Sequence, residues 1–535
     1  MRFQDWINPY ATTRLPVFAR NVVATSQPLA AQAGLRVLAQ GGNAVDAAIA
    51  AAATLAITEP VGNGLGADAF ALVWDGARLH GLNASGPSPS AWSPAYFQRK
   101  HRGRLPERGW DSVTVPGAVA GWAALHERFG RLDFEAVLAP AIEYAERGFA
   151  VSPVVQQKWA AQVDILRDYP GFAEHFLPFG RAPEVGERFV LKDAAATLRR
   201  IAQSRGRDFY EGATAHKLVA HAQAHDAALG LNDLRSYQPE WVTPIGRDFR
   251  GHTVHELPPN GQGLAALIAL GILEHFDITQ RPVDHPATQH LMVEAMKLAF
   301  ADVYAHVSDP RVVAVDPAIF LEDAYLAERA RLIDPQRAQT YTTGRAPAGG
   351  TVYLTSADQS GMMVSFIQSN YLGFGSGVVV PGTGVSLQNR GFGFTAEPGH
   401  PNQVAGGKRP FHTLIPAFVT RQGAPVMSFG IMGGNMQPQG QLQALVRMLA
   451  FGQQPQAACD APRWKWNSGL CLDVEAGLSA HVAEGLQARG HHLRASELDV
   501  QDFGSGQFVW RLGDPAVEGY VAASDSRRDG LAAGF

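Results

Sequence analysis

The sequence predicts a mixed α+β fold in which outer helices enclose two stacked sheets, an αββα four-layer sandwich. Helical segments dominate the first 350 residues, and some of them are apolar on nearly every face, as in helices buried inside a large layered protein. From Thr351 onward, short β-prone runs separated by Gly, Asp and Asn predominate. Helices that cover two stacks of strands on both outer sides satisfy both observations.

Two helical stretches are predicted between Pro28 and Ile57, separated by Gly41-Gly42. Asn43 is the expected N-cap of the second stretch. Its interior, AVDAAIAAAATLAI, is alanine on nearly every side, which predicts a helix surrounded by close neighbours. A glycine-rich loop that runs into a strand follows at residues 59–74.

The rest of the chain divides into a helical part and a strand-rich part. Residues 115–225 are predicted to be mostly helical. Further helices are expected at residues 264–276, 287–305, 440–452 and 480–489. The strand-like runs are at residues 351–358, 361–371, 377–389 and 425–432.

Composition excludes several classes of protein. With 535 residues, 46% of them hydrophobic and 18% charged, the chain is predicted to be globular rather than disordered. The net charge is −4 and no run of Lys or Arg occurs, so no nucleic-acid partner is expected. The longest apolar run, Ala47 to Ile57, is too short to span a membrane. The N-terminus lacks a basic-then-apolar signal pattern, so a cytoplasmic location is expected.

Cysteine and histidine patterns give no support for a metal or a cofactor. Cys459 and Cys471 are too few for a disulfide framework, and either one bridge or two reduced packing residues would fit, the second being favoured. The histidines show no HExxH motif and no Cys/His cluster, so no metal site is predicted. Gly62 to Gly66 follow a helix and precede a strand, the reverse of a dinucleotide fingerprint, and a tight structural turn is the better interpretation.

Three positions are candidates for chemistry. A Pro/Gly/Ala-rich stretch with few charges ends at Thr351, which begins a predicted strand and is either a nucleophile or an ordinary β-branched strand residue. Gly433-Gly434 follow the strand-like run at 425–432, and their N–H groups could form an oxyanion hole or a simple turn. His412 is either a site residue or a packed structural one. No GxSxG motif occurs, which disfavours an α/β-hydrolase.

Ten segments, in the same order, resemble the γ-glutamyltransferase (γ-glutamyltranspeptidase) family of N-terminal-nucleophile hydrolases. They are GLRVLAQGGNAVDAAIAAAATLAITEP, GNGLGADAF, TVPGAVAGW, PPNGQG, EAMKLAFAD, TVYLTSADQSGMMVSF, FGSGVVVPGTGVSLQN, GKRPFHTLIPAF, GGNMQPQGQLQ and SDSRRDGLAAG. The resemblance implies the αββα fold and a proenzyme that cuts itself between Gly350 and Thr351. A large subunit of residues 1–350 and a small subunit of residues 351–535 would result and stay intertwined.

The same resemblance implies the catalytic roles. Thr351 would attack the Gly350 carbonyl, and Gly349 and Gly350 would permit the strained turn that this attack needs. Once released, the α-amine of Thr351 has an unperturbed pKa of about 7.7–8.0 and could serve as the general base. Gly433 and Gly434 would supply the oxyanion N–H groups, and Ser369 takes the place of a family Thr that hydrogen-bonds the nucleophile.

The sequence departs from the family where the acyl group binds. Ser85, in Asn83-Ala84-Ser85-Gly86, replaces the Arg that typically holds the γ-glutamyl α-carboxylate, and a hydroxyl cannot reproduce its bidentate contact. Gly393 replaces the acidic residue that typically contacts the α-amine, and His412-Thr413 replace paired serines. Arg390 could supply the lost positive charge. Ser85, Arg390, His412 and Thr413 are therefore the predicted substrate-binding residues.

Three functions remain open on the sequence. The first is transfer or hydrolysis of the γ-glutamyl group of glutathione-like amides. The second is amide hydrolysis for another small acid, by a cephalosporin or glutaryl acylase or an oxamate-type amidohydrolase. The third is a non-catalytic protein that is never cleaved. The expected partners are a small-molecule amide and the second subunit of the same precursor, and the oligomeric state is open, a homodimer of processed units being one alternative.

Overall fold

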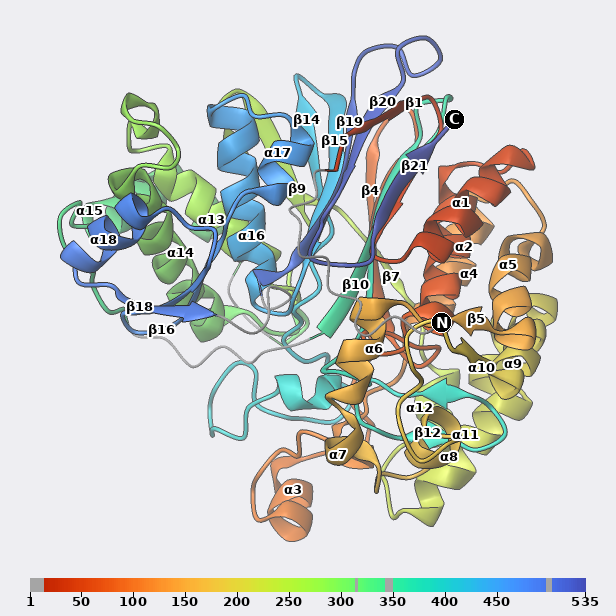
Figure 1. The fold of residues 1–535 in the computed structure, drawn as a ribbon. Coiled ribbons are helices and arrows are strands. Elements are labelled where there is room, and N and C mark those ends of the chain that lie inside the picture. Colours follow the sequence, from red (N-terminus) through yellow and green to blue (C-terminus); the bar gives the residue numbers. More distant parts are fainter. Residues whose placement is uncertain (1–13, 313–315, 342–349, 497–502) are drawn as a thin grey trace.

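Two seven-stranded sheets lie face to face, with helices on both outer sides (Figure 1). The computed structural model describes residues 14–312, 316–341, 350–496 and 503–535. The predicted α+β sandwich is confirmed. Within these residues, no helix has both the length and the apolar composition needed to cross a membrane.

The first sheet is antiparallel throughout and has the order β21-β2-β10-β11-β3-β4-β7. Its strands, in chain order, are β2 (Val22–Thr25), β3 (Asp68–Trp74), β4 (Leu79–Ala84), β7 (Glu240–Val242), β10 (Gly350–Ala357), β11 (Met363–Tyr371) and β21 (Leu531–Gly534). Strands from before and after residue 350 are therefore hydrogen-bonded to one another in one sheet.

The second sheet mixes the two parts of the chain in the same way and has the order β1-β20-β19-β15-β14-β9-β8. Its strands are β1 (Val17–Ala19), β8 (Ile245–Phe249), β9 (His252–Glu256), β14 (Ala417–Arg421), β15 (Ala424–Met432), β19 (Ser505–Arg511) and β20 (Tyr520–Ser524). Between the sheets lies a core of buried apolar side chains, among them Phe70, Tyr353 and Phe418.

Helices cover the outer face of each sheet. The first sheet is covered by α1 (Pro28–Ala39), α2 (Ala44–Thr58) and α4 (Ala118–Phe129), and the second by α13 (Gly263–Leu273), α14 (Pro286–His306) and α16 (Met436–Leu445). The other helices are α3 (Pro94–His101), α5 (Phe134–Arg147), α6 (Pro153–Ala160), α7 (Val163–Leu166), α8 (Phe172–Phe176), α9 (Lys192–Ser204), α10 (Arg207–Glu211), α11 (Ala213–Ala224), α12 (Leu231–Arg235), α15 (Asp323–Arg331), α17 (Pro455–Asp460) and α18 (Ala480–Ala488). The remaining short strands are β5 (Phe149–Ala150), β6 (Arg188–Phe189), β12 (Val379–Val380), β13 (Val385–Ser386), β16 (Trp464–Ser468), β17 (Cys471–Glu475) and β18 (His492–Ser496).

Helix α2 forms as its sequence predicts. Asn43 Oδ1 accepts the N–H of Asp46 at 3.0 Å, and Asp46 Oδ2 accepts the N–H of Asn43 at 3.1 Å, which is a reciprocal capping box. Every residue of α2 is buried, because α1 and α5 pack on it from one side and β10 and β11 from the other. The small alanine side chains permit this close packing.

Two local expectations need correction. Both cysteines are free, but only Cys459 is buried, so Cys471 is an exposed residue rather than a packing one. The run at 377–389 contributes only the two-residue strands β12 and β13, which pair with each other outside the two large sheets.

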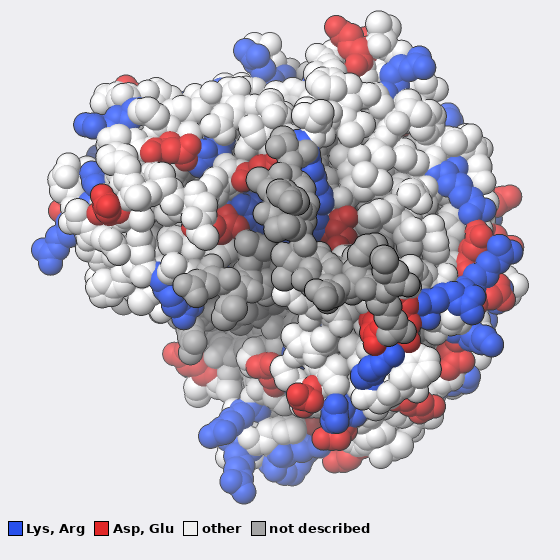
Figure 2. Space-filling model, in the orientation of Figure 1, with Lys and Arg blue, Asp and Glu red and all other residues white. Residues whose placement is uncertain are grey.

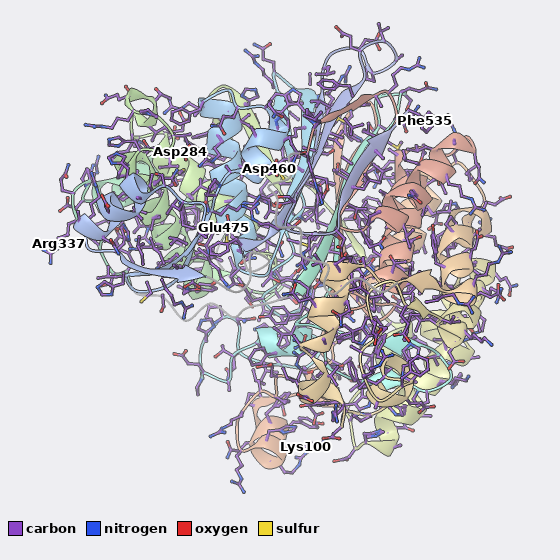
Figure 3. All side chains as sticks on the ribbon, viewed as in Figure 1. Lys100, Asp284, Arg337, Asp460, Glu475 and Phe535 are labelled. Carbon is purple, nitrogen blue, oxygen red and sulfur yellow. The ribbon has the colours of Figure 1, made fainter. Side chains whose placement is uncertain are left out.

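Charged side chains are spread over the visible face of the molecule. Figure 2 shows Lys and Arg interspersed with Asp and Glu around this face, as the small net charge suggests. Helix α3 carries Lys100 at the lower edge of the view in Figure 3, where its ammonium lies 2.9 Å from Asp111. Because positive and negative side chains are mixed on this face, they do not create the extended positive potential that would attract a polyanion.

Candidate active site

Thr351 lies near the start of β10, beside β11, and only 1% of its surface is exposed. The register between the two strands is irregular at this point, since Gly350 lies opposite Tyr371 whereas Val352 lies opposite Gln368. A bulge of this kind redirects a side chain and is common next to active sites. Thr351 Oγ1 donates to Ser369 Oγ at 3.4 Å, so the two residues predicted to act together are in contact.

The glycine-rich loop at residues 62–66 packs against the same strand. A Cβ at Gly62 would lie 3.3 Å from the carbonyl oxygen of Thr351, and one at Gly66 would lie 2.5 Å from the carbonyl oxygen of Ser386. The loop connects α2 to β3, in the helix-loop-strand order that the sequence indicates. Its glycines permit close packing beside Thr351, which agrees with the prediction of a structural turn.

Gly433 and Gly434 form the turn between β15 and α16. Their φ angles are 123° and 60°, a region that favours glycine. Gln262 holds this turn, since its Nε2 donates to the carbonyl oxygen of Gly434 at 2.9 Å and to that of Thr413 at 2.8 Å. The glycine pair is thereby fixed relative to a predicted substrate-binding residue.

Arg390 is a buried cation with unused hydrogen-bond donors. Its Nη1 donates to Thr413 Oγ1 at 2.7 Å, and its guanidinium carbon lies 4.6 Å from the centre of the Tyr371 ring. Nε and Nη2 have no hydrogen-bond partner among the described residues, although Arg390 is only 1% exposed. Burial lowers the pKa of Arg390 to about 10, so the side chain is still charged at neutral pH. Two unpaired donors on a buried guanidinium match a carboxylate.

His412 is packed against Asp68. Its Nε2 lies 3.2 Å from Asp68 Oδ2, while its Nδ1 lies 3.2 Å from the N–H of Leu414, which assigns the ring proton to Nε2. Burial, together with Arg390 and Arg409, lowers the pKa of His412 well below its usual value, so the ring is neutral. Burial raises the pKa of Asp68 to about 7, although Arg390 and the N–H groups of Gly86 and Gly117 favour its ionised form.

Ser85 is already engaged by the protein. Its Oγ donates to Asn83 Oδ1 at 2.7 Å and accepts from Asn260 Nδ2 at 3.3 Å. Its carbonyl oxygen accepts from Arg409 Nε at 3.1 Å, and Arg409 Nη1 pairs with Glu240 at 2.5 Å. A second cation therefore lies beside the position where the family Arg is missing.

One continuous series of contacts connects the nucleophile to the glycine turn. It runs through Thr351, Ser369, Tyr371, Arg390, Thr413, Gln262 and Gly434. His412 and Ser85 lie on a second, adjoining network with Asp68, Asn83 and Asn260. Gly350 is the first residue of β10, and Gly349 lies outside the described residues.

Sequence reasoning missed Asp68, Gln262 and Arg409. All three lie in segments that resemble the family, GNGLGADAF, PPNGQG and GKRPFHTLIPAF, so a signal was present. Their partners lie far away in the chain, and only the fold brings them together.

Comparison with known proteins identifies the family. A family model described as Gamma-glutamyltranspeptidase matches residues 30–535. The chain belongs to the γ-glutamyltranspeptidase family. The resemblance deduced from the sequence motifs is confirmed.

The members of the γ-glutamyltranspeptidase family that are similar to this chain are named for different enzymatic activities. The chain is 36% identical over 532 residues to the Glutathione hydrolase-like YwrD proenzyme of Bacillus subtilis, covering 96% of this chain and 98% of that one. It is 36% identical over 521 residues to the Oxamate amidohydrolase proenzyme of Klebsiella pneumoniae, covering 95% and 97%. A solved structure of a cephalosporin acylase from Bacillus halodurans matches with a TM-score of 0.95 and 45% identity, covering 100% of this chain and 99% of that one. Family membership makes the chain an enzyme of this class. Which acyl group it accepts has to be inferred from the residues of the site.

Proposed function

We propose that this protein is a self-cleaving amidohydrolase that uses Thr351 as its nucleophile and prefers acyl groups with a free carboxylate and no α-amine. The observation that supports the proposal is the buried guanidinium of Arg390, with two unpartnered N–H donors, in contact with Tyr371 and Thr413. A small acid bound through its carboxylate would satisfy both donors, and the cost of burying them unpaired would disappear.

Self-cleavage would proceed through an ester. Thr351 Oγ1 attacks the carbonyl carbon of Gly350, the C–N bond breaks, and the acyl group moves from nitrogen to oxygen. Water then hydrolyses the ester, which leaves a carboxylate on Gly350 and a free α-amine on Thr351. Ser369, whose Oγ lies 3.4 Å from Thr351 Oγ1, orients the hydroxyl for the attack.

Turnover would use the same hydroxyl. The α-amine of Thr351 takes the proton from Oγ1 as that oxygen attacks the substrate amide, and later gives a proton to the leaving amine. The N–H groups of Gly433 and Gly434 would stabilise the negative oxygen of the tetrahedral intermediate. Water would then hydrolyse the acyl-enzyme and release the acid.

The residues predicted to bind the acyl group include no acidic side chain that could pair with an α-amine. A Cβ at Gly393 would lie 2.7 Å from the carbonyl oxygen of Phe411, so no acidic side chain fits there without a backbone shift. The Ser85 hydroxyl is engaged by Asn83 and Asn260. A γ-glutamyl group could present its carboxylate to Arg390, but position 393 would offer its ammonium no acidic side chain.

γ-Glutamyl hydrolysis or transfer is the second candidate, favoured by the name of the Bacillus subtilis relative. Both candidates share the nucleophile and differ in the acyl pocket. The third alternative, a protein that is never cleaved, is less favoured because Thr351, Gly350 and Gly433-Gly434 are all present, and a denaturing gel tests it.

A substrate panel tests the proposal. Purified protein is first run on a denaturing gel, where two fragments that together account for 57.4 kDa indicate self-cleavage. Hydrolysis of γ-glutamyl, glutaryl and oxamate amides is then measured with and without a dipeptide acceptor. We expect the highest kcat/KM for an amide whose acyl group has a carboxylate and no amine, and no gain from the acceptor. A strong preference for the γ-glutamyl amide would favour the second candidate, and a single inactive chain would favour the third.

A further inference from the structure

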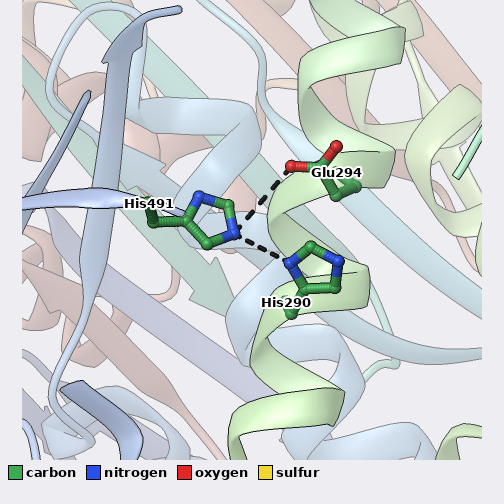
Figure 4. Close-up of side chains that lie close together, drawn as sticks. All are labelled: His290, Glu294 and His491. Atoms are coloured by element: carbon green, nitrogen blue, oxygen red, sulfur yellow. Dashed lines mark hydrogen bonds and ion pairs between the residues drawn. The ribbon is translucent and has the colours of Figure 1, made fainter. Parts of the chain in front are cut away.

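A buried polar cluster is formed by residues outside the contact networks of the proposed active site. His290, Glu294 and Lys297 follow one another at helical spacing on α14. His491 approaches His290 and Glu294 from the turn before β18 (Figure 4). His290 Nδ1 lies 2.8 Å from His491 Nε2, and Lys297 Nζ lies 2.6 Å from Glu294 Oε1. At most 2% of any of these four residues is exposed, and we call them the Glu294 cluster.

The protons in the Glu294 cluster can be assigned from its contacts. Burial lowers the pKa of His491 to about 2 and also lowers that of His290, so both rings are neutral. His290 Nε2 donates to the carbonyl oxygen of Asp334 at 2.9 Å. Its Nδ1 is therefore an acceptor, and His491 Nε2 carries the proton between the two rings.

A metal ion is the first alternative to consider, because ligand atoms of His290, Glu294 and His491 lie within 4.8 Å of one another. The contacts argue against it. The ammonium of Lys297 already neutralises Glu294. Releasing His491 Nε2 as a ligand would move its proton to Nδ1, which is buried and has no partner among the described residues.

The Glu294 cluster instead binds a segment of the chain itself. Glu294 Oε2 accepts the backbone N–H of Gln339 at 3.2 Å and the hydroxyl of Tyr341 at 3.0 Å. Lys297 Nζ donates to the carbonyl oxygen of Gln339 at 3.1 Å. With the bond from His290 to Asp334, both ends of residues 334–341 are attached to α14.

The same segment also contacts the C-terminal part of the chain. The N–H of Ala338 donates to the carbonyl oxygen of Arg489 at 2.7 Å, and Arg489 Nε donates to that of Pro335 at 3.2 Å. Most of these bonds use backbone atoms of residues 334–341. The Glu294 cluster and Arg489 therefore hold this segment mainly through its backbone atoms, with the Tyr341 hydroxyl as an added side-chain contact.

We propose that the Glu294 cluster is a docking site for residues 334–341 and that this docking positions the chain for cleavage between Gly350 and Thr351. The second part rests on the proposed function. Tyr341 precedes Thr351 by ten residues, which span at most about 35 Å, so fixing Tyr341 limits where the scissile bond can lie. After cleavage, the Glu294 cluster would keep the end of the large subunit attached to the small one through His491 and Arg489.

Substitution of Glu294 tests the docking. Glu294→Ala removes the acceptor for Gln339 and Tyr341. Gln289→Leu is the matched control: Gln289 is also buried on α14 and bonds to Val283 and Trp464, not to residues 334–341. Hydrogen exchange of the peptide covering 334–341 is measured by mass spectrometry, with the buried helix α13 as the internal reference. The Thr351→Ala background keeps every sample as one chain.

We expect exchange of 334–341 to become about tenfold faster in Glu294→Ala, because two bonds to a charged acceptor are lost, and to be unchanged in Gln289→Leu. Equal acceleration in both variants, or in neither, would overturn the docking. If Glu294→Ala does not fold, the double variant Glu294→Gln/Lys297→Met removes both charges together, avoids a lone buried charge, and should show the same loss of protection.

The effect on cleavage is measured separately, with Thr351 intact. The uncleaved fraction is followed on denaturing gels after purification, and kcat is measured on the cleaved fraction. We expect Glu294→Ala to cleave several-fold more slowly than Gln289→Leu, with kcat of the cleaved form unchanged. Loss of protection without slower cleavage would overturn the positioning role alone, whereas absence of cleavage in the unsubstituted protein would overturn the proposed function and leave the docking standing.

Zinc binding by the purified protein tests whether the Glu294 cluster is a metal site. The full-length protein is dialysed with zinc or with a chelator, and bound zinc is counted per chain. We expect no stoichiometric zinc and no change in the protection of 334–341. One zinc per chain that is lost in Glu294→Ala and kept in Gln289→Leu would overturn the assignment of Lys297 as the resident cation.

Discussion

Thr351 Oγ1 and Ser369 Oγ lie 3.4 Å apart across the bulge between β10 and β11. Ser369 Oγ also accepts the N–H of Tyr371 at 2.7 Å, which fixes the serine hydroxyl relative to the strand. A hydroxyl held in this way can orient the nucleophile but cannot replace it. Thr351 is therefore the position where the proposed chemistry is most directly tested.

Thr351→Ala is expected to remain a single chain without amidase activity, because no other hydroxyl occupies that position. Thr351→Ser should still cleave itself and retain part of the activity, since the oxygen is kept. Denaturing gels and an amide hydrolysis assay measure both outcomes. A cleaved and active Thr351→Ala protein would disprove the role of Thr351.

Gly434→Val is expected to impair turnover far more than folding. A side chain at φ 60° would rotate the N–H groups of the turn away from the developing negative charge, and losing one such donor costs about 2.7–4 kcal/mol of transition-state stabilisation. Gly452→Val is the control, because Gly452 also has a positive φ, of 67°, and has open space around its α-carbon. The measurements are kcat and the unfolding midpoint. Equal kcat for the two variants would show that Gly433-Gly434 are only a turn.

Arg390→Ala is expected to raise KM for an acidic acyl group by about 100-fold and to change little for a neutral one. The physical reason is the loss of a buried charged pair, which is worth about 2–5 kcal/mol. Arg390→Lys keeps the positive charge but loses the bidentate geometry of the guanidinium. Its KM for the acidic acyl group should therefore lie between those of the unsubstituted protein and Arg390→Ala. Glutaryl and butyryl anilides provide the comparison. If both substrates respond alike, Arg390 supports the fold and does not bind the acyl carboxylate.

Asp68→Asn is expected to change how stability depends on pH. Burial raises the pKa of Asp68 from an ordinary 3.8 to about 7, so the stability that its protonated form contributes is complete at low pH and is lost as pH rises toward 7. Relative to Asp68→Asn, the native chain should lose up to about 1.4 kcal/mol of unfolding free energy per pH unit between about pH 4 and 7.

Urea unfolding of both proteins in the uncleaved Thr351→Ala background measures this difference. The curves should run parallel above about pH 7, where Asp68 is ionised in the folded and the unfolded states. A difference that is constant from pH 4 to pH 8 would show that Asp68 is ionised throughout this range.

Local sequence rules predicted the elements that depend on local interactions. The capped helix α2, the buried helix α13 and strand β10, which begins at the proposed cleavage site, all depend on periodicity, caps and β propensity within one segment. The strands β8 and β9 were not predicted. Strand β9 pairs with β14, which is more than 160 residues away in the chain, and no nearby residue encodes that partner. Strand β8 pairs with β9 in a local hairpin whose turn holds Arg250 and Gly251 at positive φ, so a local signal for this hairpin was present and was missed.

The site divides in the same way. Thr351 and Gly433-Gly434 were found because each stands at a recognisable change of local pattern. The contact between His412 and Asp68 joins residues 344 positions apart, and that between Gln262 and Gly434 joins residues 172 apart. The resemblance to the family identified the segments that contribute to the site. Only the three-dimensional structure shows which side chains of these segments are in contact.

Because each sheet contains strands from both sides of residue 350, the sheets determine how a cleaved enzyme would respond to denaturation. In the first sheet β10, which follows the proposed cleavage site, pairs with β2, which precedes it, and in the second sheet β14 and β9 are related in the same way. Once the linking peptide is cut, a denatured molecule would have to reassemble both sheets from two separate chains, a bimolecular process in competition with aggregation. The lifetime of the mature form would then be set by its rate of unfolding rather than by an equilibrium, and heat inactivation would be permanent.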